Sequence, residues 1–154
     1  MIKHIAFIMD GNRRWAKTKR LPTLMGHAKG YKRIDPLVTY AQKLGITHVT
    51  FWAFSTENWN RDKKEVTYLM NLFRDMFKGN LLKKLVKKGG RIVVLGDINP
   101  FPQDIQENIK RVVEESKNNT SIIVNIGLNY GGRAEILHAI QTMMKDKKNI
   151  DDLT

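Results

Sequence analysis

The sequence of 154 residues contains no cysteine, which excludes disulfides, iron–sulfur clusters and thiolate zinc sites. It also has no long apolar run: the first one, residues 5–9, ends at Asp10 and is too short for a membrane span or a signal peptide. The phosphate-loop patterns G-x-G-x-x-G and G-x-x-x-x-G-K-[ST] do not occur, and neither does the zinc pattern H-E-x-x-H. Any metal site therefore has to use carboxylates, which suit magnesium better than zinc.

The composition is that of a folded protein, with 42% hydrophobic and 27% charged residues. This length predicts a single domain over residues 1–154. The missing apolar segments predict a cytoplasmic protein, with a peripheral position at a membrane as an alternative.

Acidic residues are few, and the formal net charge is +12. The excess is concentrated near the N-terminus, where residues 1–33 hold nine lysines and arginines against Asp10 alone. A basic field of this kind favours an anionic partner, which leaves nucleic acid, acidic lipid and diphosphate open.

Strand and helix patterns alternate along the chain. Apolar and β-branched runs predict strands at 5–9, 47–54, 91–95 and 121–128. Apolar residues at helical spacing predict helices at 66–77 and 81–86. Helices are also expected at 26–44, at the polar but helix-prone segment 103–117 and at 134–145. Within the first helix we expect a restart, with Asp35 as N-cap and Pro36 at the first helical position. The alternation predicts an α/β fold, a parallel sheet with helices on both faces.

Polar clusters follow the strands, at 10–15, 55–61 and 129–133. In parallel α/β folds, ligands bind beyond the carboxyl ends of the strands. Asp10 suits a magnesium anchor, Gly11 permits close approach of a ligand, and a helix starting near Asn12 would favour an anion. Arg13 and Arg14 add phosphate-binding guanidinium groups. The simpler interpretation is that Asp10 only caps that helix.

The second cluster, Ser55 to Arg61, has the same two interpretations. Ser55 with Asn58, or Thr56 with Glu57, would satisfy backbone groups at a helix start. Alternatively the cluster is a second wall of the anion site, with Arg61 as a phosphate ligand. The apolar stripe over residues 66–77 is typical of core, although methionine and phenylalanine would also suit the wall of an apolar tunnel.

Five segments in order, "HIAFIMDGNRRWA", "GHAKG", "FWAFSTENWNR" followed by Glu65, "LGD" and "LNYGGR", resemble the signature blocks of the cis-prenyltransferases. The resemblance runs from residue 4 to residue 133 and is specific. It implies the three-layer α/β/α fold of undecaprenyl diphosphate synthases. It also implies condensation of isopentenyl diphosphate with an allylic diphosphate such as farnesyl diphosphate, giving a long cis-polyprenyl diphosphate. Such products serve as cell wall lipid carriers, and the family forms homodimers.

The resemblance also implies residue roles. Asp10 would be the catalytic aspartate and Mg²⁺ ligand, and Asn58 would take part in proton removal. The substrate-binding residues would be Gly11, Asn12, Arg13, Arg14, Trp15, His27, Ser55, Thr56, Glu57, Trp59 and Arg61.

The sequence departs from the family pattern at three positions. Arg13 stands where the family usually has glycine, Thr23 where an arginine commonly binds diphosphate, and Pro36 interrupts a helix that is usually continuous. Family members also extend roughly a hundred residues further, through a block that binds isopentenyl diphosphate.

Three hypotheses fit this shorter length: a fragment, a half that requires a partner chain, or an inactive copy. A basic nucleic-acid-binding module is the alternative from another class. Product chain length is not encoded in any motif of the sequence.

Overall fold

The computed structural model describes residues 2–146, and its centre is a four-stranded parallel sheet. The strands are β1 (His4–Ile8), β2 (His48–Ser55), β3 (Gly90–Leu95) and β4 (Ile122–Tyr130), arranged in the order β1-β2-β4-β3. Phe7 pairs with Phe51, and Phe51 with Ile126. The prediction of a parallel α/β sheet is confirmed.

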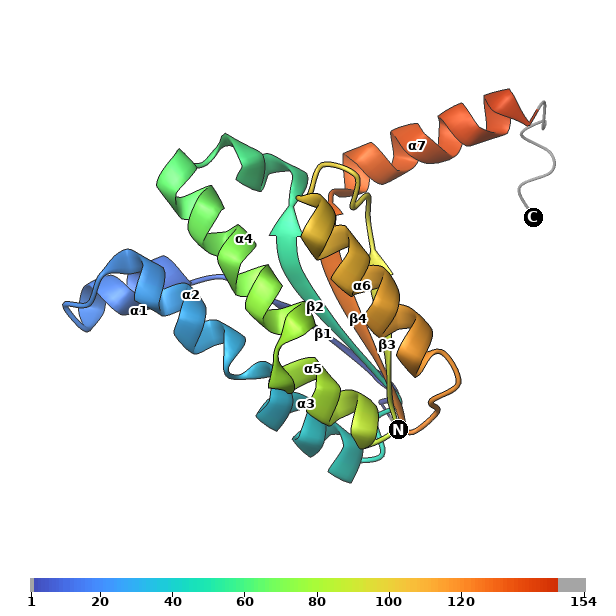
Figure 1. The fold of residues 1–154 in the computed structure, drawn as a ribbon, viewed down its shortest axis with the longest axis horizontal. Coiled ribbons are helices and arrows are strands. Elements are labelled where there is room, and N and C mark those ends of the chain that lie inside the picture. The colour runs from blue at the N-terminus through green and yellow to red at the C-terminus, as the bar shows by residue number, and fades with distance from the viewer. Residues whose placement is uncertain (1, 147–154) are drawn as a thin grey trace.

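Seven α-helices connect and follow the strands (Figure 1). They are α1 (Asn12–Thr18), α2 (Thr23–Tyr31), α3 (Ile34–Lys43), α4 (Lys63–Lys78), α5 (Asn80–Lys87), α6 (Gln103–Ser116) and α7 (Gly132–Lys145). A short 3₁₀ helix, η1 (Thr56–Asn60), follows β2. Residues 147–154 lie outside the described part. The single domain predicted for residues 1–154 therefore includes residues that the structure does not describe.

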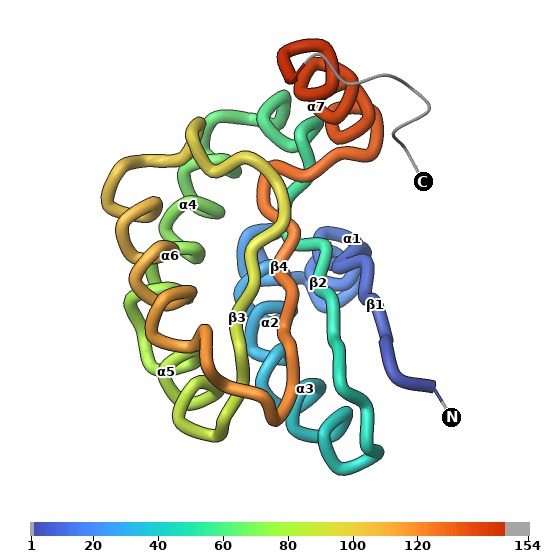
Figure 2. Tube along the Cα trace, turned by 90° about the vertical axis from the view of Figure 1, so that its right-hand side faces the viewer, coloured from blue at the N-terminus to red at the C-terminus, as the bar shows by residue number. Residues whose placement is uncertain are grey.

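The hydrophobic core lies between one face of the sheet and the helices. Along β2 the side chains alternate: Val49 and Phe51 are buried, whereas Thr50 and Trp52 on the opposite face are not. Figure 2 shows the strands in front of α2 and α3, and shows α7 projecting away from the sheet. The described helices that carry buried apolar side chains thus gather on the Phe51 side of the sheet.

The helix predicted over 26–44 is divided into α2 and α3, but the break differs from the expected one. The predicted N-cap at Asp35 is wrong, because the N-cap is Arg33 and Pro36 is the third residue of α3. Proline is tolerated there because the first-turn N–H groups have no partner within the helix. Asp35 instead faces α5, where its carboxylate lies 3.3 Å from the amine of Lys84.

The strands bring the predicted polar clusters to the same end of the sheet, where the carboxyl ends of the strands lie. Asp10 follows β1, Ser55 ends β2 and Asn129 lies near the end of β4. Because β1 and β2 pair in parallel, their carboxyl ends point the same way and bring Asp10 and Ser55 to the same end of the sheet.

Candidate functional site

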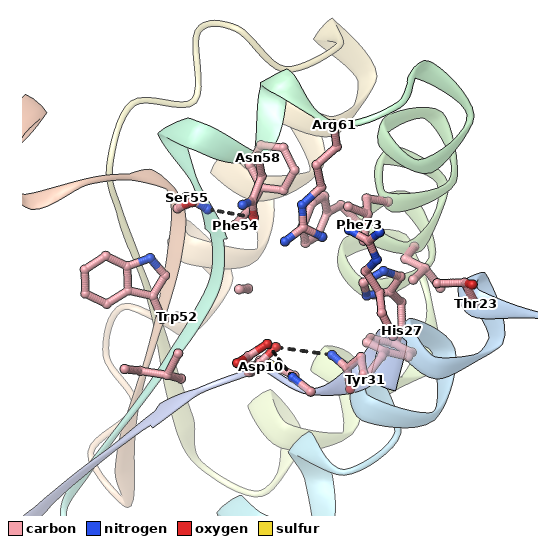
Figure 3. Close-up of a pocket in the computed structure, with 18 of the residues that line it drawn as sticks. Asp10, Thr23, His27, Tyr31, Trp52, Phe54, Ser55, Asn58, Arg61 and Phe73 are labelled. Carbon is pink, nitrogen blue, oxygen red and sulfur yellow. Dashed lines mark hydrogen bonds between the residues drawn. The ribbon is translucent and has the colours of Figure 1, made fainter. Parts of the chain in front are cut away.

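A cavity of about 870 Å³ opens at the carboxyl ends of β1 and β2 (Figure 3). Its polar lining comes from the β1–α1 segment, α2 and the β2–η1 segment. Of the residues predicted to form the site, these line it: Asp10, Gly11, Asn12, Arg13, Arg14, His27, Ser55, Asn58 and Arg61. One cavity thus unites side chains from three separate segments of the sequence, the first at Asp10 and the last at Arg61.

Asp10 does not cap α1. The N-cap is Gly11, whose φ of 82° lies in the left-handed region that favours glycine, and no side chain caps the helix. The Asp10 carboxylate accepts a hydrogen bond from the backbone N–H of Gly11 and one of 2.9 Å from Nη2 of Arg14. These two interactions lower the pKa of Asp10, the Gly11 hydrogen bond most strongly, so the carboxylate is ionised at neutral pH.

Glu65 of α4 lies at the centre of a cluster of two arginines and a histidine. Its Oε1 accepts hydrogen bonds from Nη1 of Arg61 at 2.8 Å and from Nε2 of His27 at 3.0 Å, while Oε2 lies 3.7 Å from Nη1 of Arg13. Burial raises the pKa of Glu65, but the hydrogen bond from His27 and the charges of the two arginines outweigh it, so the pKa is lowered overall. Glu65 therefore holds its partners together as an ionised carboxylate.

His27 is mostly neutral at neutral pH. Burial lowers its pKa below the ordinary value, and the hydrogen bond with Glu65 only partly opposes this effect. With Nε2 donating to the Glu65 carboxylate, Nδ1 of the neutral ring is left as an acceptor.

Ser55 and Asn58 have the local role that the simpler interpretation of this cluster anticipates, and they also line the cavity. They form a capping box at the start of η1, in which Oδ1 of Asn58 accepts a hydrogen bond of 3.2 Å from the Ser55 N–H. This bond fixes the amide of Asn58 at the cavity wall (Figure 3).

Four of the predicted site residues are placed outside the cavity lining. Nε1 of Trp59 donates a 2.9 Å hydrogen bond to Oδ1 of Asn129, and its ring packs edge-on against Phe54. Oγ1 of Thr56 lies 2.5 Å from the position that a Cβ at Gly131 would take. Glu57 is exposed, and Trp15 on α1 is 40% exposed. Trp59 accordingly belongs to an aromatic cluster that supports the second wall.

The inner part of the cavity is apolar. Leu69, Leu72, Phe73 and Met76, from the stripe on α4, line it together with Ile34 of α3. The apolar stripe on α4 therefore belongs both to the core and to the cavity wall. Leu69, Phe73 and Met76 are members of the core cluster and of the cavity lining.

Sequence reasoning assigned no role to Glu65 and did not anticipate Tyr31, Ile34 or Trp52 in the lining. For Glu65 a signal existed: it lies four residues after Arg61, the spacing at which helical ion pairs form. The other three come from strands and helices that pack next to the site only in the folded chain.

The donor set fits a magnesium ion bound largely through substrate oxygens. Within residues 2–146, no group of three histidine or acidic side chains is arranged to hold a metal ion. Magnesium, however, usually takes only one or two carboxylates and completes its shell with water and phosphate oxygens. Each Asp10 oxygen has one hydrogen-bond partner and retains a free lone pair.

No helix among the described residues is long and apolar enough to cross a membrane.

The family model described as "Putative undecaprenyl diphosphate synthase" matches residues 8–154. An isoprenyl transferase of Clostridium perfringens is 43% identical over 99% of this chain and 62% of its own length. The (2E,6E)-farnesyl-diphosphate-specific ditrans,polycis-undecaprenyl-diphosphate synthase of Micrococcus luteus is 42% identical over 96% of this chain and 59% of its own length. The chain thus spans about 60% of the length of these relatives.

Solved structures agree with the sequence comparisons. The lavandulyl diphosphate synthase of Lavandula x intermedia, solved with dimethylallyl diphosphate, superposes with a TM-score of 0.89 at 29% identity, over 99% of this chain and 66% of the other. A probable undecaprenyl diphosphate synthase from Campylobacter jejuni gives a TM-score of 0.76, also at 29% identity, over 97% and 65%. The chain therefore belongs to the undecaprenyl diphosphate synthase family of isoprenyl transferases.

Proposed function

We propose that this chain carries the allylic-diphosphate half of a cis-prenyltransferase site. The full reaction would condense isopentenyl diphosphate with an allylic diphosphate such as farnesyl diphosphate and yield a long cis-polyprenyl diphosphate. One observation carries the proposal: a single cavity joins a cationic mouth to an apolar interior in a chain of this family. That polarity matches an amphiphile with a diphosphate head and a hydrocarbon tail.

The cationic mouth would bind the diphosphate. Arg13, Arg14 and Arg61 present guanidinium groups whose geometry fits phosphate oxygens, and the first turn of α1 adds free N–H groups. Charge that develops on the leaving diphosphate would be stabilised by these fixed donors.

The apolar interior would hold the hydrocarbon chain and keep water away from the allylic carbon. Phe54 and Phe73 belong to the lining, and aromatic rings stabilise a carbocation-like fragment. Orientation of the tail along this wall would also place the reacting carbon.

Asp10 would be the protein ligand of Mg²⁺, and the ion would supply charge neutralisation at the leaving diphosphate. The exposed carboxylate at the cavity mouth supports this role, since its side chain is 73% exposed and already ionised. Asn58 is a neutral amide and a weak base, so we propose that it positions a proton path without itself taking the proton.

The test is farnesyl diphosphate binding measured by calorimetry with and without Mg²⁺. Asp10→Ala should weaken magnesium-dependent binding by about tenfold or more, the loss of one charge-assisted interaction. Asp146→Ala, which removes an exposed carboxylate at the end of α7, is the matched control and should bind like the wild type. Equal affinity of the two variants would contradict the assignment of Asp10.

The complete activity belongs to the proposal as well, because the matched relatives are longer than this chain. We expect weak transfer of radiolabelled isopentenyl diphosphate by the chain alone, and recovery when the region that follows the match in a relative is added. Recovery of transfer activity would identify the chain as a fragment or as a half that requires a partner. An inactive copy would show no transfer in the mixture.

Homodimer assembly, a cytoplasmic position and peripheral association with a membrane are further parts of this proposal. The comparisons favour prenyl transfer over the nucleic-acid-binding alternative.

A further inference from the structure

Lysines are concentrated on a surface formed by α3 and α5, at the end of the sheet opposite the cavity mouth. Helix α3 leads into the start of β2 and α5 into the start of β3, so both lie where strands begin (Figures 1 and 2). We call this surface the α3–α5 face. Its exposed residues are Tyr40, Lys43, Leu44, Lys83, Lys84, Lys87 and Lys88.

The lysines of α5 point outward because its apolar side is fixed in the core. Leu82 is fully buried and Leu85 is 2% exposed. Lysines spaced four residues apart then lie in two rows on the outer side, Lys83 with Lys87 and Lys84 with Lys88, the residue that caps the helix. Together these four side chains border one shallow depression.

Few acidic groups balance this charge. The carboxylate of Asp35 lies 3.3 Å from Nζ of Lys84 and 3.4 Å from Nζ of Lys88, which also donates to Oγ1 of Thr39. Lys83 and Lys87 form no ion pair with any residue in 2–146. The face therefore keeps a net positive charge with two lysines available to a partner.

Exposed apolar groups lie next to Lys43, at the end of α3. Ile34 and Val38 turn one side of α3 toward the core, and Asp35 turns another toward α5, so Tyr40 and Lys43 lie on the outer side. Tyr40 is 62% exposed and Leu44, just after the helix, is 52% exposed. Tyr40 lies three residues before Lys43 and Leu44 directly follows it. A tyrosine ring and a leucine beside a lysine suit the boundary between phosphate headgroups and acyl chains.

We propose that the α3–α5 face is a docking surface for a bilayer containing anionic phospholipids. Charge complementarity favours such a surface, because lysine ammonium groups attract anionic headgroups without needing a fixed geometry. The cations of α5 and its C-cap residue Lys88 are all lysine, and the exposed Tyr40 and Leu44 near Lys43 add an apolar contact that a nucleic acid backbone would not use.

This inference rests on the proposed function, which gives the reason why the protein would dock on a membrane. A polyprenyl product is insoluble in water, and Ile34, in the apolar part of the cavity lining, directly precedes Asp35 beneath the α3–α5 face. Docking by this face would place the apolar end of the cavity on the bilayer side and leave the cationic mouth open to water.

The test is sedimentation of the chain with vesicles of phosphatidylcholine alone or mixed with phosphatidylglycerol. The wild type should bind only the mixed vesicles, and salt should weaken the binding. Lys83→Glu/Lys87→Glu should raise the lipid concentration for half-binding by about tenfold or more, since each lysine near an anionic surface contributes on the order of 1 kcal/mol.

The matched control is Lys63→Glu/Lys110→Glu, which makes the same change in net charge at two exposed lysines away from this face. It should bind vesicles nearly as well as the wild type. An equal loss in both double variants would overturn the proposal, because only net charge would then matter. Preference of the wild type for polyuridylic acid over mixed vesicles would overturn it too.

Farnesyl diphosphate binding without lipid separates this inference from the proposed function. The Lys83→Glu/Lys87→Glu variant should keep that binding unchanged while it loses vesicle binding. If the wild type binds no farnesyl diphosphate, the proposed function fails, but a selective loss of vesicle binding in this variant still supports the docking surface.

Discussion

At the scale of single residues, the site depends on a carboxylate that is surrounded by positive charge. Glu65 is 8% exposed and contacts Arg13, His27 and Arg61. Without it, three cationic or polar side chains would face one another at the cavity wall. Its structural role is to fix the orientation of groups that we propose bind diphosphate.

Glu65→Gln should lower the free energy of unfolding by about 2 kcal/mol, because it leaves partly buried charges without their counter-ion. Chemical denaturation measures the change. The matched control is Glu115→Gln, which removes an exposed pair with Arg111 and should cost less than about 1 kcal/mol. An equal cost for both substitutions would show that Glu65 is an ordinary surface partner.

His27 should make stability depend on pH. Its pKa in the folded chain lies below the ordinary value of 6.5, mainly because of burial. The unfolded chain therefore takes up a proton at a higher pH than the folded chain. Stability from this group is fully present above 6.5, falls as the pH drops from there toward the folded-state pKa, and then levels off.

The measurement is the urea midpoint between about pH 7.5 and pH 5.5, a window that brackets the ordinary histidine pKa. His27→Gln should show a smaller fall than the wild type, whereas His138→Gln, at an exposed position on α7, should not differ from it. A wild-type slope retained in His27→Gln would contradict the pH dependence assigned to this residue.

At the scale of elements, the arginines of α1 are positioned by close packing of α1 on α2. A Cβ at Gly26 would lie 2.0 Å from the backbone oxygen of Asn12, and one at Gly30 would lie 2.4 Å from its Oδ1. Only glycine lets the two helices approach this closely. The two glycines of "GHAKG" therefore allow the β1–α1 segment to pack against α2, the helix that also carries His27.

Gly26→Ala should push α1 away from α2, with a stability cost of about 1–3 kcal/mol from overpacking. Farnesyl diphosphate should also bind more weakly, because Arg13 and Arg14 move with α1. Gly132→Ala is the control: no atom lies within 4 Å of its added Cβ, so stability and binding should stay near wild type. Unchanged binding in Gly26→Ala would show that the position of α1 does not govern the site.

At the scale of the whole molecule, large apolar side chains remain exposed away from the cavity. On α7, Ile136 is 63% exposed, Ile140 is 47% exposed and Met144 is 75% exposed. Their spacing of four residues puts them on one side of the helix. An apolar stripe of this kind favours association with another protein surface.

We expect the chain to self-associate as its concentration rises, and sedimentation velocity measures this. Ile136→Glu/Ile140→Glu should shift the distribution toward the monomer. Gln141→Glu/Thr142→Glu adds the same two charges to exposed positions of α7 and should have the smaller effect. Monomer at every concentration in the wild type would contradict the expectation.

Much of the fold was predictable because its signals are local. Apolar runs located the four strands, and helix patterns located α4 to α7 and, as one interrupted helix, α2 and α3, whereas α1 has no such pattern. The alternation of strands and helices predicted the parallel sheet. The ends of these strands then identified where Asp10 and Ser55 would meet. The position of the α3 N-cap was missed because Pro36 fits any position in the first turn.

The sequence by itself determined the succession of strands and helices, the family and the polar segments from which the cavity mouth is built. The tertiary structure alone decided which partners those segments have. Asp10 turned out not to cap α1, Trp59 bonds to Asn129 seventy residues away, and Glu65 gathers Arg13 and His27 from other elements. The physical reason is range: strand and helix patterns repeat within a few residues, whereas these contacts exist only once β1-β2-β4-β3 and its helices have packed.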